Sequence, residues 1–466
     1  MKIDQNFIKN HVPQARIEGA VFDGEGAWRV DSRSIQPGDI FVALSGVQHN
    51  GHDFVEDAFA RGARSCVVQN DEFVRLESRI GRFLQQATCV IVADPLAALI
   101  TWASAWRNLF SYPVIGVTGS LGKTSTKEYI AHVFRLSGKL YVASEGNQNT
   151  LLGSALNIMR MRGDHEYAIF EMGISARGEM QALVDLVRPT TGVITYIGHQ
   201  HMEGLGSLAD IAAEKRLIFG ALRQDGVGFV NGDQPLLAQV AYSHPVIKFG
   251  LKMVNQIQAR QVHHHDNTTS CVMKLYRDRY SLALTTEHSA CVYHALAAAA
   301  VAHYFGIPAP DILKALEQPL EVPSRFQKRV FGNAGQHMII DDAYNANPES
   351  MKAALLAFER CNVQGKKIAI LGDMLGLGIS APFWHRQIGR FLRKASSLHH
   401  VILVGEHMKW ACKMLIHGTS VELQPTWQGA VAAAQTYVDQ EPSCILVKGS
   451  HDIGLQHVVT AFMEQI

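Results

Sequence analysis

The 466-residue chain lacks a charge excess, a paired-cysteine pattern and long apolar runs. Its 43 Lys and Arg residues nearly balance 42 Asp and Glu residues, and the formal net charge of +1 argues against the basic surfaces of nucleic-acid and membrane-surface proteins. The seven cysteines show no CxxC spacing, which disfavours a disulfide framework or a structural zinc site. We therefore expect reduced, mostly buried thiols.

Export and membrane signals are also missing from the sequence. The N-terminal residues MKIDQNFIKN lack the apolar core of a signal peptide, and no later stretch offers about 18 uninterrupted apolar residues. We expect a cytoplasmic protein without stable membrane contact. What the chain does have is a globular composition, with 47% hydrophobic and 18% charged residues.

The length and the alternation of strand and helix patterns predict three α/β domains. The expected domains cover residues 1–109, 110–320 and 321–466. The first has short apolar runs and a helical stretch after Pro95. The second begins where the strand 114–118 runs into a glycine-rich turn and a helix over 124–136. The third follows a break near Pro319.

The second domain is expected to hold a mostly parallel sheet with helices on both faces. Further strands are predicted at 167–170, 192–196 and 228–231. The polar segment 256–279 predicts an antiparallel addition, and the alanine-rich run 295–303 predicts a tightly packed helix. The adjacent His263, His264 and His265 lie in a polar stretch, where a solvated loop is favoured over a metal site.

A glycine-rich loop carries the clearest chemical signal. After the strand 114–118 come Gly119, Ser120, Leu121, Gly122, Lys123, Thr124 and Ser125, and then a helix. Backbone N–H groups and the positive helix end would meet there, which suits the phosphates of ATP. The Lys123 ammonium would face the β and γ phosphates, and the Thr124 hydroxyl would face magnesium. Because Val117 stands where such loops usually begin with glycine, an ordinary glycine turn is the alternative.

Motifs along nearly the full chain resemble those of the Mur ligases, which build the peptide stem of peptidoglycan. The loop 118–128 is similar to the ATP loop of that family. Further similar segments follow in order at 31–33, 37–44, 51–54, 171–173, 201–207, 213–215, 341–351 and 371–374. The string Tyr344, Asn345, Ala346, Asn347, Pro348 resembles the member that adds D-alanyl-D-alanine, since the single-amino-acid ligases carry histidine-containing versions there.

The resemblance implies an ATP-dependent amide ligase that joins D-alanyl-D-alanine to a UDP-muramoyl tripeptide through an acyl phosphate. The first domain would bind the UDP-sugar peptide, the second ATP and the third the amino substrate. ATP and two Mg²⁺ ions are the implied cofactors, and a monomer is expected. The third residue of the acceptor peptide, lysine or diaminopimelate, stays open.

The resemblance also implies residue roles. Lys123, His201 and Lys215 would be catalytic, and Lys215 would be carbamylated, which turns a cation into a carboxylate-like metal ligand. The implied metal ligands are Thr124, Glu171, His201 and Lys215. Arg325 and Asp342 would join the loop residues Gly119, Ser120, Gly122, Lys123, Thr124 and Ser125 in binding ATP. The implied substrate contacts are Ser32, Arg33, Asn147, Asn149, Asn345, Asn347, Ser350 and Lys448.

The residues by themselves leave other interpretations open. Glu171 ends a predicted strand, where ligands of α/β sheets gather, but it could also cap the following turn. Without the family, His201 would be a surface or core histidine and Lys215 a solvated helix lysine. The segment at Asn147 fits a plain turn, and Asn347 before a proline fits a helix start.

Several positions depart from the family pattern. The adenine motif appears as residues 288–294 without its two asparagines, and Tyr196 replaces another asparagine. Gly376 occupies the place of a glutamate and His451 that of an arginine. Two further functions therefore stay open: a related ligase with an altered amine acceptor, and a non-catalytic nucleotide-binding relative or ATPase switch. The segment 31–33 argues against folate polyglutamation, which belongs to the same superfamily.

Overall fold

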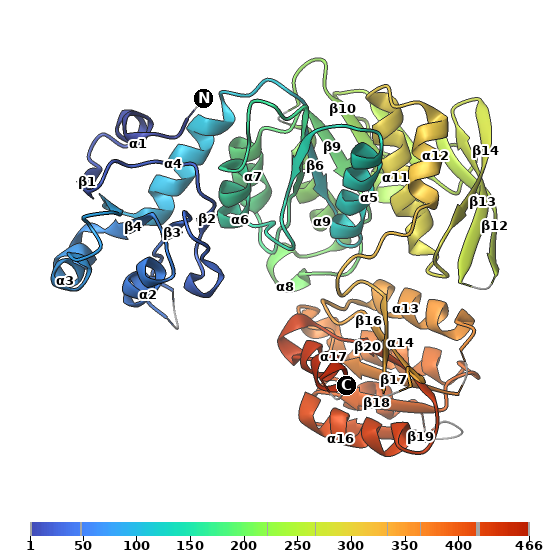
Figure 1. Ribbon diagram of the computed structural model, residues 1–466. Helices are drawn as coiled ribbons and strands as arrows, with labels where there is room; N and C mark the ends of the chain where they lie inside the picture. Colours follow the sequence, from blue (N-terminus) through green and yellow to red (C-terminus); the bar gives the residue numbers. More distant parts are fainter. Residues whose placement is uncertain are drawn as a thin grey trace.

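Three α/β domains follow one another along the chain, each built around its own sheet (Figure 1). The computed structural model describes residues 2–46, 49–220, 222–265, 267–332, 334–363, 365–415 and 420–464. The predicted fold class is confirmed. The seven cysteines are free, and five of them are buried.

The first sheet has the strand order β1-β5-β4-β3-β2, with β1 antiparallel to β5 and the other described pairs parallel. Its strands are β1 (Arg16–Gly19), β2 (Trp28–Arg29), β3 (Ile40–Val42), β4 (Ser65–Gln69) and β5 (Thr88–Val92). Its helices are α1 (Gln5–His11), α2 (Val55–Ala60) and α3 (Asn70–Ile80). The central strands are buried on both faces, which explains their continuous apolar runs.

The second sheet has the order β14-β13-β12-β11-β10-β9-β6-β8-β7. Its strands are β6 (Val114–Thr118), β7 (Tyr141–Ala143), β8 (Tyr167–Glu171), β9 (Thr191–Ile194), β10 (Val227–Asn231), β11 (Val246–Gly250), β12 (Ile257–His265), β13 (Thr268–Leu275) and β14 (Asp278–Leu284). Its helices are α5 (Lys123–Leu136), α6 (Leu151–Ile158), α7 (Glu179–Val187), α8 (Met202–Leu205), α9 (Leu208–Arg216), α10 (Pro235–Ala238), α11 (Ala290–Tyr304) and α12 (Ala309–Glu317). The pairs from β7 to β12 are parallel, and β12, β13 and β14 form the predicted antiparallel addition. The alanine-rich helix is confirmed as α11, whose residues 295–302 are all buried.

The third sheet has the order β15-β16-β20-β17-β18-β19, with β15 antiparallel to β16. Its strands are β15 (Gln327–Phe331), β16 (His337–Asp341), β17 (Lys366–Gly372), β18 (His400–Val404), β19 (Ser420–Gln424) and β20 (Ser443–Lys448). Its helices are α13 (Pro348–Arg360), α14 (Ala381–Leu392), α15 (Lys409–Cys412), α16 (Trp427–Val438) and α17 (Gln456–Met463). The domain lies below the second one in Figure 1, next to α8.

Helix α4 (Pro95–Arg107) joins the first two domains and is bonded to both. Trp102 Nε1 donates to the carbonyl of Ile8 at 3.2 Å in the first domain. Five residues further along the helix, the buried Arg107 guanidinium donates to the carbonyl of Val187 at 2.7 Å in the second domain. The C-terminal half of the helix therefore makes polar contacts with both domains.

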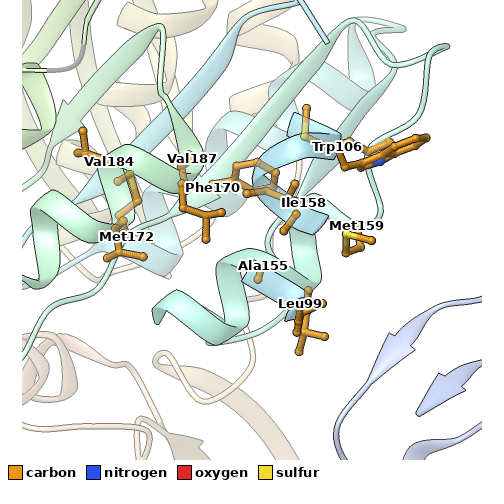
Figure 2. Packing of buried hydrophobic residues seen from close by; sticks show 14 of the residues in the cluster. Leu99, Trp106, Ala155, Ile158, Met159, Phe170, Met172, Val184 and Val187 are labelled. Atoms are coloured by element: carbon orange, nitrogen blue, oxygen red, sulfur yellow. The ribbon is translucent and has the colours of Figure 1, made fainter. Parts of the chain in front are cut away.

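Apolar packing reinforces this junction. Figure 2 shows Leu99 and Trp106 of α4 beside Ala155 and Ile158 of α6, with Phe170 of β8 in the same buried cluster. Each fully buried side chain of this kind stabilises the fold by about 1.5–3 kcal/mol. The first two domains thus share one hydrophobic core.

The prediction of a solvated loop at His263, His264 and His265 is wrong. These residues form the last part of β12 and pair with β13, His264 opposite Thr269. His264 Nδ1 lies 2.8 Å from Thr269 Oγ1. A polar sequence can form a strand where one face meets water, because backbone pairing does not depend on the side chains.

None of the helices in the described part of the chain is both long and apolar enough to cross a membrane.

Candidate active site

A cleft of about 1080 Å³ lies between the second and third domains. It opens beyond the carboxyl ends of β6, β8 and β9, which is where open α/β sheets bind ligands. The predicted site residues that line it are Ser120, Gly122, Lys123, Thr124, Ser125, Asn147, Asn149, Glu171, His201, Arg325, Asp342, Asn345, Asn347, Ser350 and Lys448. The structure therefore gathers residues from distant segments into one place. Gly119, Lys215, Ser32 and Arg33 lie outside this lining.

Four buried polar atoms of the cleft have no hydrogen-bond partner among the described residues. They are Ser120 Oγ, Glu171 Oε2, Gln200 Oε1 and Glu349 Oε2. Buried polar groups are normally paired, and each unpaired one costs about 1–3 kcal/mol. Their gathering in one cleft indicates a site for a polar ligand.

The phosphate loop is shaped by its two glycines. Gly122 has a φ of 73°, in the left-handed region, and a Cβ on Gly119 would overlap Thr195 Oγ1. The loop backbone is tied to the neighbouring strand end, since Ser120 donates its N–H to the carbonyl of Tyr196 at 2.7 Å. These constraints hold the loop at the start of α5, where N–H groups are free for an anion.

Two cations flank the loop. Lys123 Nζ donates to the carbonyl of Gly119 at 2.9 Å, and burial lowers the pKa of this ammonium while Glu171 opposes the shift. From the third domain's side, Arg325 Nη2 donates to Thr124 Oγ1 at 3.4 Å, and its guanidinium lies 3.6 Å from the centre of the Tyr344 ring. The loop is therefore prepared for an anion that would bridge both domains.

Arg325 belongs to the segment that joins α12 to β15. Its neighbours Ser324 and Phe326 both have left-handed backbone angles, with φ of 53° and 56°. Such angles are uncommon outside glycine. The connection between the domains is therefore sharply turned on both sides of Arg325.

Glu171 ends β8 and is 1% exposed. Its Oε1 accepts a hydrogen bond from Asn149 Nδ2 at 2.7 Å, and its Oε2 is one of the unpaired atoms. No group of three or more His, Cys, Asp or Glu residues that could hold a metal occurs in the described ranges. A single buried carboxylate with an unpaired oxygen fits Mg²⁺, which usually takes one or two carboxylates and completes its shell with substrate phosphates and water. Glu171 and the Thr124 hydroxyl are of the ligand types that this ion prefers.

Lys215 is 2% exposed on α9, so the solvated-face interpretation of this lysine is wrong. The cause is tertiary packing, which covers this side of the helix. Burial lowers the pKa of Lys215 well below its ordinary value, and the charge of Lys123 lowers it further. His201, with a left-handed φ of 51° before α8, has its pKa lowered to about 4 by burial and then by Lys123 and Lys215. The three residues therefore share one electrostatic neighbourhood.

The third domain contributes a buried ion pair to the cleft. Lys448 Nζ lies 2.7 Å from Asp342 Oδ2 and also donates to the carbonyl of Asn345 at 3.0 Å. Burial lowers the pKa of Lys448, while Asp342 counteracts the shift. Asp342 also accepts the backbone N–H of Phe326 at 3.2 Å, which links the pair to the segment next to Arg325.

Asn347 and Ser350 form the start of α13. Asn347 Oδ1 accepts from the backbone N–H of Ser350 at 2.8 Å, and Ser350 Oγ accepts from that of Asn347 at 3.0 Å. This reciprocal pattern caps the helix, with Pro348 in its first turn. The alternative that Asn347 marks a helix start is therefore correct, and both side chains also line the cleft.

Ser32 and Arg33 lie in the first domain. Arg33 is exposed and forms an ion pair with Asp31, Nη2 to Oδ2 at 2.7 Å, and Ser32 is buried. The structure does not bring either residue into the cleft.

Sequence reasoning gave no role to His294 or Glu349. His294 Nδ1 lies 3.1 Å from Thr126 Oγ1, and its ring fills the space that a Cβ on Gly122 would take. Burial lowers the pKa of His294 to about 3. The altered adenine motif marked the position of His294 but not its contact with the phosphate loop. Glu349 lies in the family-like segment 341–351, but nothing in the sequence singled it out within that segment.

Three family models match successive parts of the chain. They are the Mur ligase family catalytic domain at residues 28–93, the Mur ligase middle domain at 117–302 and the Mur ligase glutamate ligase domain at 324–451. A UDP-N-acetylmuramoyl-tripeptide–D-alanyl-D-alanine ligase of Bacillus subtilis (strain 168) is 35% identical over 382 residues, which cover 82% of this chain and 80% of the relative. The chain belongs to the Mur ligase family. A relative of the same name from Treponema pallidum (strain Nichols) is 31% identical and is covered over 96% of its length, with 95% of this chain.

Solved structures agree with this assignment. A crystal structure of MurF from Acinetobacter baumannii has a TM-score of 0.82 at 25% identity and covers 100% of this chain and 99% of that one. The MurF ligase of Thermotoga maritima in complex with ADP has a TM-score of 0.76 at 24% identity, with 95% and 98% covered, and shows the shared fold. The predicted Mur ligase resemblance is confirmed, and the protein is an ATP-dependent ligase of this family.

Proposed function

We propose that this Mur ligase joins D-alanyl-D-alanine to a UDP-N-acetylmuramoyl tripeptide in peptidoglycan precursor synthesis. Relatives that match nearly the whole chain carry this activity in their names. The observation that carries the proposal is the cleft itself, where the phosphate loop of one domain meets Arg325 and the Asp342–Lys448 pair of the other. Cytoplasmic location and a monomeric state stay predictions.

The three domains divide the substrates between them in this proposal. Residues 1–109 bind the UDP-sugar peptide, with Ser32 and Arg33 at its nucleotide end. Residues 110–320 bind ATP, and residues 321–466 bind the amine. The two substrates of the first step, ATP and the tripeptide, would meet in the cleft, with the lining residues Asn147 and Asn149 beside the acceptor.

Amide formation needs a better leaving group than hydroxide, and transfer of the γ-phosphoryl of ATP to the tripeptide carboxylate provides one as an acyl phosphate. Lys123 and Arg325 offset the negative charge that gathers at this phosphoryl group. The loop N–H groups orient the phosphates, and closure of the cleft around the substrates would keep water from the acyl phosphate. The amine then attacks the acyl carbon, and phosphate leaves.

Magnesium supplies positive charge at the phosphates when it is bound, held by Thr124 and Glu171, with His201 and Lys215 toward a second ion. The lowered pKa of Lys215 supports its carbamylation, since only the uncharged amine adds carbon dioxide. The carbamate is an anion and would relieve the repulsion between Lys215 and Lys123.

A ligase with another amine acceptor is the second candidate. Gly376 has a left-handed φ of 71° and accepts the backbone N–H of Met202 at 2.9 Å, so it serves as a contact between domains. His451 is exposed at the cleft, with its ring centre 6.0 Å from that of Tyr344. Both residues lie where the amine would bind, and both differ from the family pattern. The choice of amine should therefore be tested with several amines.

The decisive experiment is phosphate release with UDP-muramoyl tripeptide, ATP and a panel of amines. Turnover only with D-alanyl-D-alanine supports the proposal, and preference for another dipeptide or a single amino acid supports the second candidate. Absence of phosphate release with every amine would refute both and leave a nucleotide-binding relative without ligase activity.

A further inference from the structure

Glu349 presents one fixed and one free carboxylate oxygen to the cleft. It is the second residue of α13, and its Oε1 lies 2.5 Å from Nδ1 of His199. The same oxygen accepts the backbone N–H of His199 at 3.4 Å. Its Oε2 is buried and has no hydrogen-bond partner among the described residues. The contact with His199 therefore orients the carboxylate and leaves Oε2 for another group.

The free oxygen lies near the phosphate loop. Tyr196, whose carbonyl accepts the Ser120 N–H, is two residues before Gly198. A Cβ built on Gly198 would be 3.2 Å from Glu349 Oε2 and 3.3 Å from the Tyr196 ring. Glu349 Oε2 thus lies next to the segment 196–198, whose Tyr196 carbonyl is hydrogen-bonded to the phosphate loop.

The charges around the cleft indicate what this oxygen would bind. Lys448 is paired with Asp342, Lys123 with a loop carbonyl, and Arg325 with Thr124 and Tyr344. No Lys or Arg in the described ranges forms an ion pair with Glu349. The Glu349 side chain is 24% exposed and its Oε1 has His199 as a partner, so the unsatisfied group is the buried Oε2 atom, which is costly without a donor or a cation. Among the groups that react in the proposed ligation, phosphate and carboxylate are anionic and only the amine arrives as a cation.

We propose that Glu349 is the counter-ion for the ammonium group of the amine substrate, and that His199 is the residue that positions it. The inference rests on the proposed ligase function. It assigns to Glu349 the selection of substrates that carry a free amino group. An ammonium bound at Oε2 would be held in the cleft that the phosphate loop lines. After it releases one proton to solvent, the neutral amine attacks the acyl carbon, the bond from that carbon to the phosphate oxygen breaks, and the departing phosphate takes the second proton.

A purely structural role for Glu349 makes a different prediction. The contact between Glu349 and His199 also ties the third domain to the second, and the Trp384 ring centre lies 4.3 Å from that of His199. Loss of such a tie would loosen the contact between the two domains on either side of the cleft. It would therefore impair ATP, tripeptide and amine together.

The test is Glu349→Gln, which keeps the shape and an oxygen for His199 but removes the charge. We expect the KM for D-alanyl-D-alanine to rise about 10- to 100-fold, because hydrogen bonds to charged groups are worth that much, while the KM values for ATP and tripeptide stay unchanged. Glu359→Gln is the matched control, since it changes the same residue type near the other end of α13, outside the cleft lining. It should leave all three KM values unchanged.

A charge probe completes the test. N-acetyl-D-alanyl-D-alanine lacks the ammonium group. In the wild type its inhibition constant should therefore be far higher than the KM for the free dipeptide. In Glu349→Gln the two constants should be similar. An unchanged amine KM in Glu349→Gln, or an equal rise of all three KM values, overturns the proposal. If another amine supports turnover, the same variants are measured with that amine. If the wild type fails to release phosphate with every amine tested, the proposed ligase function is wrong, and the proposed role of Glu349 is wrong with it.

Discussion

The two ends of helix α5 offer a matched pair of glycines with different surroundings. Gly122 precedes the helix with a φ of 73°, and a Cβ there would overlap Cε1 of His294 and lie 3.1 Å from its Nδ1. Gly138 follows the helix with a φ of 74° and has nothing within 4 Å of such a Cβ. Alanine at either position meets the same backbone strain, but only at Gly122 does it meet a side chain.

The expected effect of Gly122→Ala follows from these contacts. The left-handed conformation costs an L-residue about 1–2 kcal/mol. His294 must also move, which breaks its contact with Thr126 Oγ1 at a cost of roughly 1 kcal/mol. The loop relieves this strain by leaving the shape that presents its N–H groups to phosphate. We therefore expect nucleotide binding to weaken by about 2–3 kcal/mol, or roughly 30- to 150-fold in Kd.

Isothermal titration with ADP, together with thermal unfolding, measures both effects. Gly138→Ala should lower stability by about 1–2 kcal/mol and leave the Kd for ADP unchanged. The double variant Gly122→Ala with His294→Ala should regain part of the affinity, because the smaller side chain gives the methyl group room. If Gly122→Ala binds ADP as tightly as Gly138→Ala does, His294 does not constrain the loop and the reasoning is refuted.

Three further predictions concern buried charges. Lys215→Ala should abolish phosphate release, and added short carboxylates should restore part of it by replacing the carbamate; an unimpaired variant would contradict the proposed role. Because burial lowers the pKa of His294 to about 3 from 6.5, the unfolded chain binds a proton first as the pH falls. Relative to His294→Asn, the wild type should therefore lose about 2 kcal/mol of unfolding free energy between pH 7 and pH 5 in urea titrations, and equal losses would contradict this. Lys448→Met should lower the unfolding free energy by about 3–5 kcal/mol, since it leaves Asp342 buried without a counter-ion, and adding Asp342→Asn should recover much of this loss in the same titrations.

The order of elements could be predicted because local patterns decide it. The apolar run 114–118 before a glycine turn gave both the strand and the phosphate loop, and the alanine-rich segment gave α11. The antiparallel addition over 256–279 was predicted, but His263, His264 and His265 were assigned to a loop, because a run of polar residues does not show that its backbone pairs with β13 in a hairpin.

The site could be predicted in part, for the same physical reason. Motif order placed Lys123, which begins α5 after the loop that follows β6, and Glu171, which ends β8. A helical pattern cannot show which face tertiary packing will cover, so the sequence did not reveal the burial of Lys215. Contacts such as those of His294 with the loop and of Glu349 with His199 join residues 150 or more positions apart, and no local pattern encodes them.

The sharply turned connection at Arg325 would couple a rotation of the third domain to the position of the Arg325 guanidinium. Helix α4 fastens the first domain to the second, so a rotation of the third domain against the other two would leave that junction intact. Such a rotation would pivot at the left-handed pair Ser324 and Phe326, and the residue between them carries the guanidinium that reaches Thr124. Each widening of the cleft would pull a positive charge away from the phosphates. Opening the exit and loosening the spent nucleotide would then be a single event.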